Sequence, residues 1–479
     1  MADLMFRAVD ELASMVRTGE LSARELVQES LDRIDELNPQ LNAFVDVFAD
    51  EALAEADSVG ADDPRPYAGV PIAIKNNRAV AGKRLTVAAE FMGDFVPKHD
   101  DNVVARLKAA GFIVVGTTTL PEWGILPITD TRRFGTTRNP YDPERTPGGS
   151  SGGSASAVSS GMVPIAHGND GGGSTRIPAA CCGLVGLKAQ RGRVSTAPVG
   201  GGEFLVNDGV LSRTVAETAA VLDLIAGYVN GDAYWAPDPS EPFAATAGRA
   251  PGKLRIAATT NPPLDNSPVD AEAVRSVAVA AEILRGLGHE VEEVDPPWHM
   301  PDVLRMFTAV FGPLVSLNIA FAELVAGREA VEEDMEAVSW AIYQLCKTGI
   351  SSVDGAAAQV QLPAFSRSVL DWMEGYDALI TPALAEAPVL HGVMDPQGPD
   401  PMGTFRRSGE FTPFTATFNV SGQPAVSVPL CDREDGIAVP LSVQLVGQPA
   451  QEGALLALAA QLETARDWTP PRPAVATAA

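Results

Sequence analysis

Apolar and polar residues follow two different periods along the chain, one typical of helices and one typical of strands. Between residues 8 and 38 apolar side chains recur every three or four positions, which is the spacing of amphipathic helices. Ser22 followed by Glu25 is typical of a capping box and predicts that the second helix begins there. Residues 69–75 form a short β-branched apolar run bounded by glycine and proline, which predicts a buried strand.

Helical and extended segments keep alternating toward the C-terminus, which is typical of an α/β fold. Residues 101–118 show a helix, a glycine stop and a strand, and residues 253–294 show a strand–helix–strand unit. Residues 301–375 are expected to be mainly helical. Two further strands are expected at 376–384 and 424–430, before a last helix.

The composition shows no break large enough to split the chain, so we predict one domain over residues 1–479. Its core is expected at about 60–230 and 376–465, with a helical insertion at about 295–375. A linker rich in proline, glycine and alanine near 230–253 keeps a two-lobed arrangement open as the alternative. The C-terminal tail, TPPRPAVATAA, is expected to be disordered.

Charge and cysteine content exclude several classes of protein. The chain has 35 Lys and Arg residues against 61 Asp and Glu residues, a net charge of −26. Such an acidic surface repels phosphate backbones and anionic lipid headgroups, so we expect neither nucleic-acid nor membrane binding. No apolar run is expected to approach the ~20 residues of a membrane span, and the N-terminal stretch is unlike a signal peptide. The four cysteines form no metal-binding pair, so we expect a cytoplasmic protein without a disulfide framework.

Three segments carry residues suited to chemistry: Lys75, the glycine–serine loop 148–154 and the glycine loop 168–176. Consecutive glycines let main-chain N–H groups converge on one point, where they can hold a phosphate or a developing oxyanion. Neither loop completes a phosphate-binding motif, so nucleotide binding is the weakest alternative. The loop 148–152 formally fits the nucleophile elbow of Ser-His-Asp esterases, but a proline-rich loop precedes it where the elbow needs a strand. The histidine closest in sequence to the second loop is His167, which leaves the esterase as an alternative.

A lysine can replace histidine as the base if burial keeps its amine neutral. Lys75 follows an apolar run, and no acidic residue comes directly after it. A neutral Lys75 could take a proton from a nearby serine, which in turn relays it from the attacking serine. The competing interpretation is an ordinary strand-end lysine whose amine reaches solvent.

Residues 148–195 resemble the signature of the amidase signature family, serine amidohydrolases with a Ser–cis-Ser–Lys triad. Further matches lie at 69–75, 111–124, 376–384 and 418–430, in the family's order and at compatible spacing. The resemblance covers most of the chain and is weakest across 230–375. It implies an α/β fold with a mixed central β-sheet flanked by helices.

Carried over position by position, the resemblance implies that Ser174 is the nucleophile and that Lys75 is the final base. Ser150, preceded by a cis peptide bond, would pass the proton between them. The main-chain N–H groups of Ser174 and the glycine turn would form the oxyanion hole and so bind substrate; the turn consists of Gly171, Gly172 and Gly173.

Three further residues are expected to support this loop rather than react, namely Ser151, Asp170 and Arg176. We expect Asp170 and Arg176 to form an ion pair that holds the turn. Asn76 departs from the family, which usually has an acidic residue after the lysine, and this could alter the pKa of Lys75 or the local loop. No metal or organic cofactor is implied.

The nearest branch of the family contains hydrolases of nylon-type cyclic amide oligomers and urethane-cleaving amidases. The resemblance therefore implies a hydrolase of small non-peptide carboxamides, aliphatic, aryl or cyclic, with carbamates also within reach. The alternative within the family is the amidase-like subunit of a tRNA-linked amidotransferase, against which the acidic charge argues. The expected partner is the small-molecule substrate, and a homodimer is left open.

Specificity is expected to lie in residues 301–375 and in the loops 120–135 and 197–210, where the resemblance fades. Candidate walls of the substrate pocket are the aromatic residues Trp123, Phe134, Phe204, Phe307 and Trp340.

Overall fold

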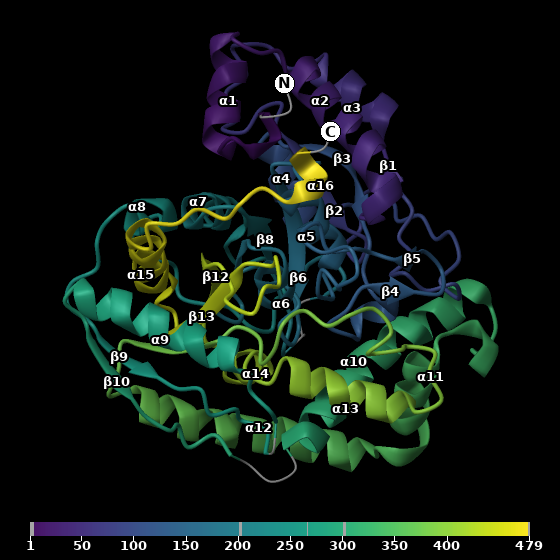
Figure 1. The fold of residues 1–479 in the computed structure, drawn as a ribbon. Helices are drawn as coiled ribbons and strands as arrows, with labels where there is room; N and C mark the ends of the chain where they lie inside the picture. The colour runs from purple at the N-terminus through teal and green to yellow at the C-terminus, as the bar shows by residue number, and fades with distance from the viewer. Residues whose placement is uncertain (1–3, 201–203, 266, 300–302, 478–479) are drawn as a thin grey trace.

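An 11-stranded sheet runs through the molecule and places the candidate residues at the ends of neighbouring strands (Figure 1). The computed structural model describes residues 4–200, 204–265, 267–299 and 303–477. The strand order is β1-β3-β2-β6-β8-β7-β12-β13-β11-β9-β10. Helices lie on both faces of the sheet, so the prediction of an α/β fold with a mixed central sheet is confirmed.

Three parallel strands form the part of the sheet that positions the site. They are β2 (Pro71–Lys75), β3 (Ile113–Thr118) and β6 (Ile165–Asp170). Every residue of these strands is buried, as expected for parallel strands covered on both faces. Because β2 and β6 are parallel neighbours, Lys75 and Asp170 lie at the same edge of the sheet.

The remaining strands of the sheet complete its mixed pattern. β8 (Asn207–Ser212) pairs antiparallel with β6 and with β7 (Val185–Lys188). β12 (Ala425–Cys431) and β13 (Leu441–Gly447) follow, both antiparallel to their neighbours. β12 was predicted from its apolar run, whereas β7, β8 and β13 were not, because glycines and polar residues interrupt or shorten their apolar runs. A separate two-stranded sheet joins β4 (Asp130–Thr131) and β5 (Gly135–Thr136).

The N-terminal segment is helical as predicted. It comprises the 3₁₀ turn η1 (Leu4–Phe6) and helices α1 (Val9–Thr18), α2 (Ala23–Leu41) and α3 (Ala49–Ala56). The capping box of Ser22 and Glu25 at the start of α2 is confirmed. The short strand β1 (Phe44–Val47), antiparallel to β3, was not predicted.

The helices that cover the central strands also follow the predicted alternation. They are α4 (Asn102–Ala109), α5 (Gly152–Ser159), α6 (Arg176–Cys181) and α7 (Val215–Ile225). The predicted linker contains one short helix, α8 (Phe243–Ala247). After it, β9 (Arg255–Ala258), α9 (Ala271–Gly286) and β10 (Glu290–Glu293) form the predicted parallel unit. β9 pairs with β11 (Ala378–Pro382), so this unit belongs to the main sheet.

Residues 303–373 are mainly helical, as predicted. They comprise α10 (Val303–Ala326), the 3₁₀ turn η3 (Glu332–Asp334), α11 (Ala337–Gln344), the π-turn η4 (Leu345–Gly349) and α12 (Ser352–Met373). Two further helices, α13 (Pro401–Phe411) and α14 (Ala416–Ser421), were not predicted. α10 packs on α12 and α11, and α14 packs on α12.

Helix α10 corrects one expectation from the sequence. Its 24 residues have a mean hydropathy of 1.8 over their most apolar window, which is long and apolar enough for a membrane span by those criteria alone. The expectation that no apolar run approaches that length was wrong. The reason is that Arg305 and Glu323 lie near the two ends of the helix and leave an uncharged stretch between them.

The C-terminal helices are α15 (Glu452–Ala465) and α16 (Ala474–Thr477). The tail was expected to be disordered, and for residues 474–477 this was wrong. The carbonyl of Ala476 accepts a hydrogen bond of 3.3 Å from the guanidinium of Arg33 in α2, which holds this turn against the N-terminal helices.

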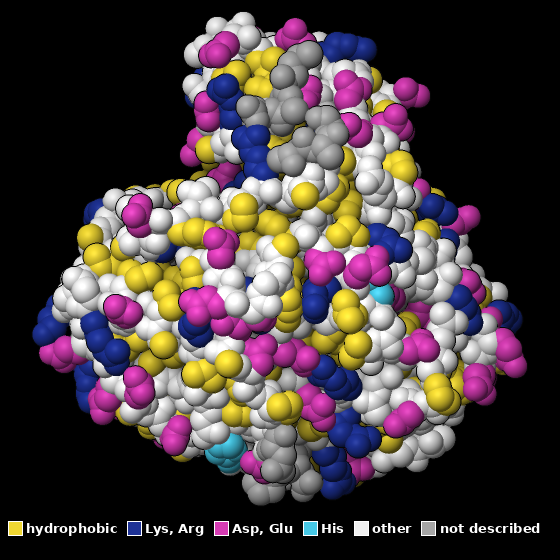
Figure 2. Space-filling model, in the orientation of Figure 1, with side chains coloured by type: hydrophobic (Ala, Val, Ile, Leu, Met, Phe, Trp, Pro, Cys, Tyr) yellow, Lys and Arg dark blue, Asp and Glu magenta, His cyan; other side chains and the backbone are white. Residues whose placement is uncertain are grey.

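Figure 2 shows acidic side chains scattered among basic ones over one face of the molecule, with no continuous basic stripe on that face. This distribution agrees with the net charge of −26.

Candidate active site

Lys75 is the last residue of β2, and its side chain is fully buried. Its Nζ lies 2.7 Å from Ser150 Oγ and 3.4 Å from the carbonyl oxygen of Asn169. Burial, with a smaller effect from the nearby Arg78 guanidinium, lowers the pKa of Lys75 to about 7. The competing interpretation of a strand-end lysine in solvent was therefore wrong, and the amine can act as a base near neutral pH.

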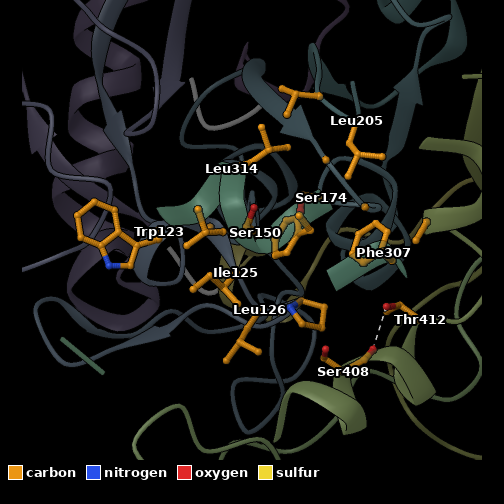
Figure 3. A pocket seen from close by; sticks show the side chains of 18 of the residues that line it. Trp123, Ile125, Leu126, Ser150, Ser174, Leu205, Phe307, Leu314, Ser408 and Thr412 are labelled. Atoms are coloured by element: carbon orange, nitrogen blue, oxygen red, sulfur yellow. Dashed lines mark hydrogen bonds between the residues drawn. The ribbon is translucent and has the colours of Figure 1, made fainter. Parts of the chain in front are cut away.

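Ser150 lies between Lys75 and the cavity that holds Ser174. It follows a cis peptide bond from Gly149 and is 3% exposed. Ser150 and Ser174 both line the cavity, where Figure 3 shows them close together near its centre. The main-chain N–H of Ser151 donates to the carbonyl of Ser174 at 3.2 Å, which ties the two loops to each other.

Ser174 lies in the turn between β6 and α6, at the end of the three glycines. Within the described part of the chain, no acceptor engages the main-chain N–H groups of Gly171, Gly172 and Ser174. The N–H of Gly173 differs, because it donates to Asp170 Oδ1 at 2.7 Å. The expectation that all four donors are available is corrected accordingly: three remain for an oxyanion, and the fourth fixes the turn.

A buried ion pair between Asp170 and Arg176 holds this turn. Arg176 Nε donates to Asp170 Oδ2 at 2.9 Å, and both side chains are 1% exposed. Burial opposes ionisation of Asp170, but the Arg176 guanidinium and the Asn419 amide hold the pKa of Asp170 well below its usual value. The side chain therefore stays an anion that accepts the Gly173 N–H at any ordinary pH.

Two residues missed by sequence reasoning complete the support of Arg176. Asn419 Oδ1 and Gln444 Oε1 accept from the guanidinium at 2.6 and 2.8 Å. Asn419 lies in the segment 418–430 that carried part of the resemblance, so the sequence offered a feature that could have pointed to it. Gln444 lies in the unpredicted strand β13, 268 positions from Arg176, and no sequence feature pointed to it.

The substitution Gly173→Ala is expected to damage the turn. Gly173 has φ +134°, which side chains rarely adopt, and an added Cβ would lie 2.5 Å from Ile177 Cδ1. We expect the free energy of unfolding to fall by about 1–3 kcal/mol and kcat to fall by about 10²-fold, measured by thermal denaturation and anilide hydrolysis. Gly171→Ala is the control, since its Cβ would meet only Val206 Cγ2, at 3.8 Å. It should keep the wild-type melting temperature, and equal losses in both variants would contradict the argument.

The unusual Asn76 does not face Lys75. Its amide donates to the carbonyl of Arg84 and to Thr117 Oγ1, at 2.9 and 3.0 Å. Its Oδ1 accepts from the main chain and the hydroxyl of Thr86, at 2.8 and 2.6 Å. Asn76 therefore fixes the loop after β2 with all its hydrogen-bonding groups.

The esterase alternative requires a histidine bonded to a serine. His167 Nε2 lies 3.1 Å from Asp208 Oδ1, both side chains are fully buried, and burial lowers the pKa of His167. Its Nδ1 has no hydrogen-bond partner among the described residues. Because no hydrogen bond of the ring reaches a serine hydroxyl in the described structure, His167 has an acid partner but no nucleophile.

The cavity beside the two serines has a volume of about 450 Å³ and mainly apolar walls (Figure 3). Arg78 is its only charged lining residue among those described, and the Arg78 Nε donates to Asp208 at 2.9 Å. Helix α10 contributes one long wall, α13 contributes Ser408, and Thr412 follows directly after α13.

Of the five aromatic residues expected in the walls, only Trp123 and Phe307 line the cavity. Phe204 instead packs under the Arg191 guanidinium, 3.9 Å from the ring centroid, and Trp340 packs on Tyr343. Phe134 lies near the β4–β5 hairpin with Arg133 over its ring. These contacts depend on residues distant from the cavity, which the sequence pattern does not reveal. Of the 197–210 loop, residues 201–203 lie outside the described structure.

A pair of buried carboxyl groups connects the cavity wall to the helical insertion. Glu122 precedes Trp123 in the 3₁₀ turn η2 (Glu122–Gly124), and Glu336 precedes α11. Glu122 Oε2 accepts the main-chain N–H of Glu336 at 2.8 Å, and Glu336 Oε1 accepts that of Arg132 at 2.7 Å. Burial raises the pKa of Glu122 to about 7, and burial together with the Glu122 charge raises that of Glu336 to about 8.

This pair predicts a loss of stability as pH rises from about 5 to about 8. Because both pKa values are raised in the folded state, the folded protein binds more protons than the unfolded chain between pH 4.5 and about 8, and stability declines across that interval. Glu122→Gln, which cannot ionise, should show a shallower decline of melting temperature between pH 5 and 8. The exposed Glu282→Gln should keep the wild-type slope, and identical slopes in all three proteins would contradict the prediction. The other charged groups that act on the pair are Arg132, Glu90 and Asp130.

Comparison with known proteins adds independent findings. The family model described as Amidase matches residues 25–456. A putative amidase of Synechocystis sp. is 37% identical over 98% of this chain and 91% of its own. The 6-aminohexanoate-cyclic-dimer hydrolase of Paenarthrobacter ureafaciens is 35% identical over 96% of this chain and 95% of its own. A solved structure of 6-aminohexanoate cyclic dimer hydrolase complexed with substrate superposes with a TM-score of 0.92 at 32% identity, covering 99% of this chain and 100% of that one.

Proposed function

Because the chain belongs to the amidase family and is therefore a hydrolase of amide C–N bonds, we propose that Ser174 is its nucleophile and that Ser150 and Lys75 relay the proton. The observation that carries the proposal is the buried contact of 2.7 Å between Lys75 Nζ and Ser150 Oγ, at the cavity that Ser174 also lines. A buried amine with a pKa of about 7 is neutral in about half of the molecules at pH 7.

The reaction proceeds through an acyl-enzyme. Ser174 Oγ attacks the carbonyl carbon of the amide, while its proton passes to Ser150 and the proton of Ser150 passes to Lys75. The negative oxygen of the tetrahedral intermediate accepts from the free N–H groups of the glycine turn. As the C–N bond breaks, the proton returns from Lys75 through Ser150 to the leaving nitrogen. Water then attacks the carbonyl carbon of the ester on Ser174 and gives one proton to the same relay. The bond between this carbon and Ser174 Oγ breaks, the relay returns the proton to Ser174 Oγ, and the acid leaves.

The walls of the cavity favour a neutral substrate. Among the residues that the structure describes, Arg78 is the single charged one in the lining, and it is already paired with Asp208. A charged group on the substrate would therefore lose its hydration without gaining a partner among these residues. We propose small non-peptide carboxamides, aliphatic, aryl or cyclic, as the substrates. The relatives named for a cyclic dimer of 6-aminohexanoate support the cyclic members, because ring closure removes the charged ends.

A substrate screen tests this proposal. Purified protein is offered anilides, aliphatic amides, carbamates, and the cyclic and linear dimers of 6-aminohexanoate. We expect hydrolysis of the neutral amides and a kcat/KM at least about tenfold lower for the zwitterionic linear dimer than for the cyclic one. Absence of turnover for every amide, or covalent labelling at a serine other than Ser174, would contradict the proposal.

On the resemblance to urethane-cleaving amidases we propose that carbamates are cleaved as well. On the net charge of −26 we propose a cytoplasmic location without nucleic-acid or membrane partners. We propose a free-standing hydrolase rather than a subunit of a tRNA-linked amidotransferase, in one domain whose 303–373 helices face the substrate. A homodimer is compatible with this arrangement.

A further inference from the structure

Helix α10 presents a mainly apolar face to the cavity, in which Asn318 is the polar member and its amide donates to the carbonyl of Leu314 at 3.2 Å. Its lining residues recur every three or four positions, as the side chains of one helix face do. They include Phe307, Phe311, Leu314, Leu317 and Phe321. At the inner end, the Phe307 ring lies against the glycine turn, since a Cβ added at Gly172 would be 3.4 Å from Phe307 Cζ.

The same face continues out of the cavity into solvent. Leu317 and Phe321 line the cavity and are nevertheless 66% and 43% exposed, so they lie at its mouth. Leu324, one turn further along, is 78% exposed and does not line the cavity. A row of large exposed apolar side chains is unusual on a protein surface and marks a binding site more often than chance exposure does.

Two observations indicate that the row is a prepared surface. The ring of Phe321 meets that of Phe95 edge to face, with 5.3 Å between centroids, so its position is fixed from outside the helix. Glu323 is the only charged residue in this half of α10, and its carboxylate accepts from the Tyr343 hydroxyl and the Ala330 N–H at 2.7 and 2.9 Å. Because the carboxylate has these hydrogen-bond partners, it does not bring a free charge to the exposed apolar side chains of Leu317, Phe321 and Leu324.

We infer that Leu317, Phe321 and Leu324 form an apolar ledge that binds a long hydrocarbon chain of the substrate where it leaves the cavity. The occupant is a substrate chain because the ledge is the direct continuation of the cavity wall that begins beside the oxyanion turn. From Phe307 to Leu324 the helix rises by about 25 Å, which suits an extended chain rather than a compact group. The inference rests on the proposed function and specifies its substrate class: neutral amides that carry a long, unbranched apolar chain.

A chain-length series tests the ledge. One series varies the acyl chain of anilides from four to twelve carbons, and a second varies the amine of acetamides over the same range, both below their aggregation concentrations. We expect kcat/KM to rise at least about tenfold along one of the two series, since each methylene buried on an apolar surface is worth up to about fourfold in binding. The series that responds identifies the side of the amide that lies on α10.

Serine substitutions distinguish the ledge from apolar side chains exposed elsewhere on the protein. Phe321→Ser and Leu324→Ser should each lower the ratio of kcat/KM for the longest to the shortest substrate at least about threefold. The matched control is Val360→Ser on α12, which removes an apolar side chain that is 72% exposed and outside the cavity, and which should leave this ratio unchanged.

Each alternative outcome overturns the inference. One is a kcat/KM that does not change with chain length in either series, and another is an equal change of the long-to-short ratio in ledge and control variants. A third is a shift from dimer to monomer in sedimentation that only the ledge variants cause. The fourth is binding of the protein to neutral phosphatidylcholine vesicles that the ledge variants abolish. Turnover of short amides without chain-length preference would overturn the ledge and leave the proposed function intact. Absence of turnover for all amides would instead contradict the proposed function itself.

Discussion

Replacing Ser174 by alanine is expected to lower kcat for an anilide at least about 10⁴-fold, because the substitution removes the proposed nucleophile beside the glycine turn. We do not expect Ser150 to replace it, since the Ser150 hydroxyl contacts Lys75 at 2.7 Å and is the proposed proton relay. Substrate affinity should change little, because the substitution removes one oxygen from a cavity of about 450 Å³. The effect should therefore appear in kcat rather than in KM.

Steady-state kinetics and mass spectrometry of the intact protein measure this expectation. A slowly hydrolysed activated amide should add one acyl group to the wild type and none to Ser174→Ala. The control is Ser276→Ala on α9, a fully buried serine far along the chain whose hydroxyl donates to Ala273 O at 2.7 Å. It should retain turnover and labelling. Comparable loss of activity in both variants, or an acyl group on the Ser174→Ala protein, would show that Ser174 is not the nucleophile.

The second large effect is expected for Lys75→Met. Removal of a general base typically costs a factor of about 10²–10⁴, and we expect kcat to fall within that range. In the wild type only the neutral amine is active, so kcat/KM should rise with pH and level off above the Lys75 pKa of about 7. Below that pKa the activity should fall about tenfold for each unit of pH. In Lys75→Met this acid limb should disappear.

The stability of Lys75→Met separates catalysis from folding. Because burial lowers the pKa of Lys75 from 10.5 to about 7 in the folded state, the unfolded chain binds more protons between these values. The lysine therefore costs stability most below pH 7, and the cost vanishes as pH approaches 10.5. The melting temperature of Lys75→Met should exceed that of the wild type at pH 6 and converge with it toward pH 10.

A second buried lysine provides the control. Lys188 in β7 is fully buried as well, its pKa is lowered by burial, and its Nζ donates to the carbonyl of Ala189 at 2.8 Å. It does not line the cavity. Lys188→Met should keep the fall of kcat/KM below pH 7. If Lys188→Met lost this fall and Lys75→Met kept it, the assignment of Lys75 as the base would be wrong.

Local sequence determined those elements whose signal lies within a few residues. The apolar run of β2, the capping box of α2 and the alternation of strand, helix and strand over 255–293 each leave a pattern within a short stretch of the chain. The resemblance to the amidase signature family, carried by several motifs along the sequence, also predicted that Lys75, Ser150 and Ser174 share one site. Side-chain periodicity and motif spacing are properties of the chain itself, so they can be read without a fold.

Tertiary structure decided everything that depends on partners distant in sequence. It buried the Lys75 amine, engaged the Gly173 N–H with Asp170, and joined Arg176 to Gln444 across 268 positions. It also joined Glu122 to Glu336, the residue before α11, across 214 positions. Such contacts are set by the sheet order and by the helices packed on it. The pKa of a group and the availability of a donor depend on this environment, because desolvation and nearby charge act through space rather than along the chain.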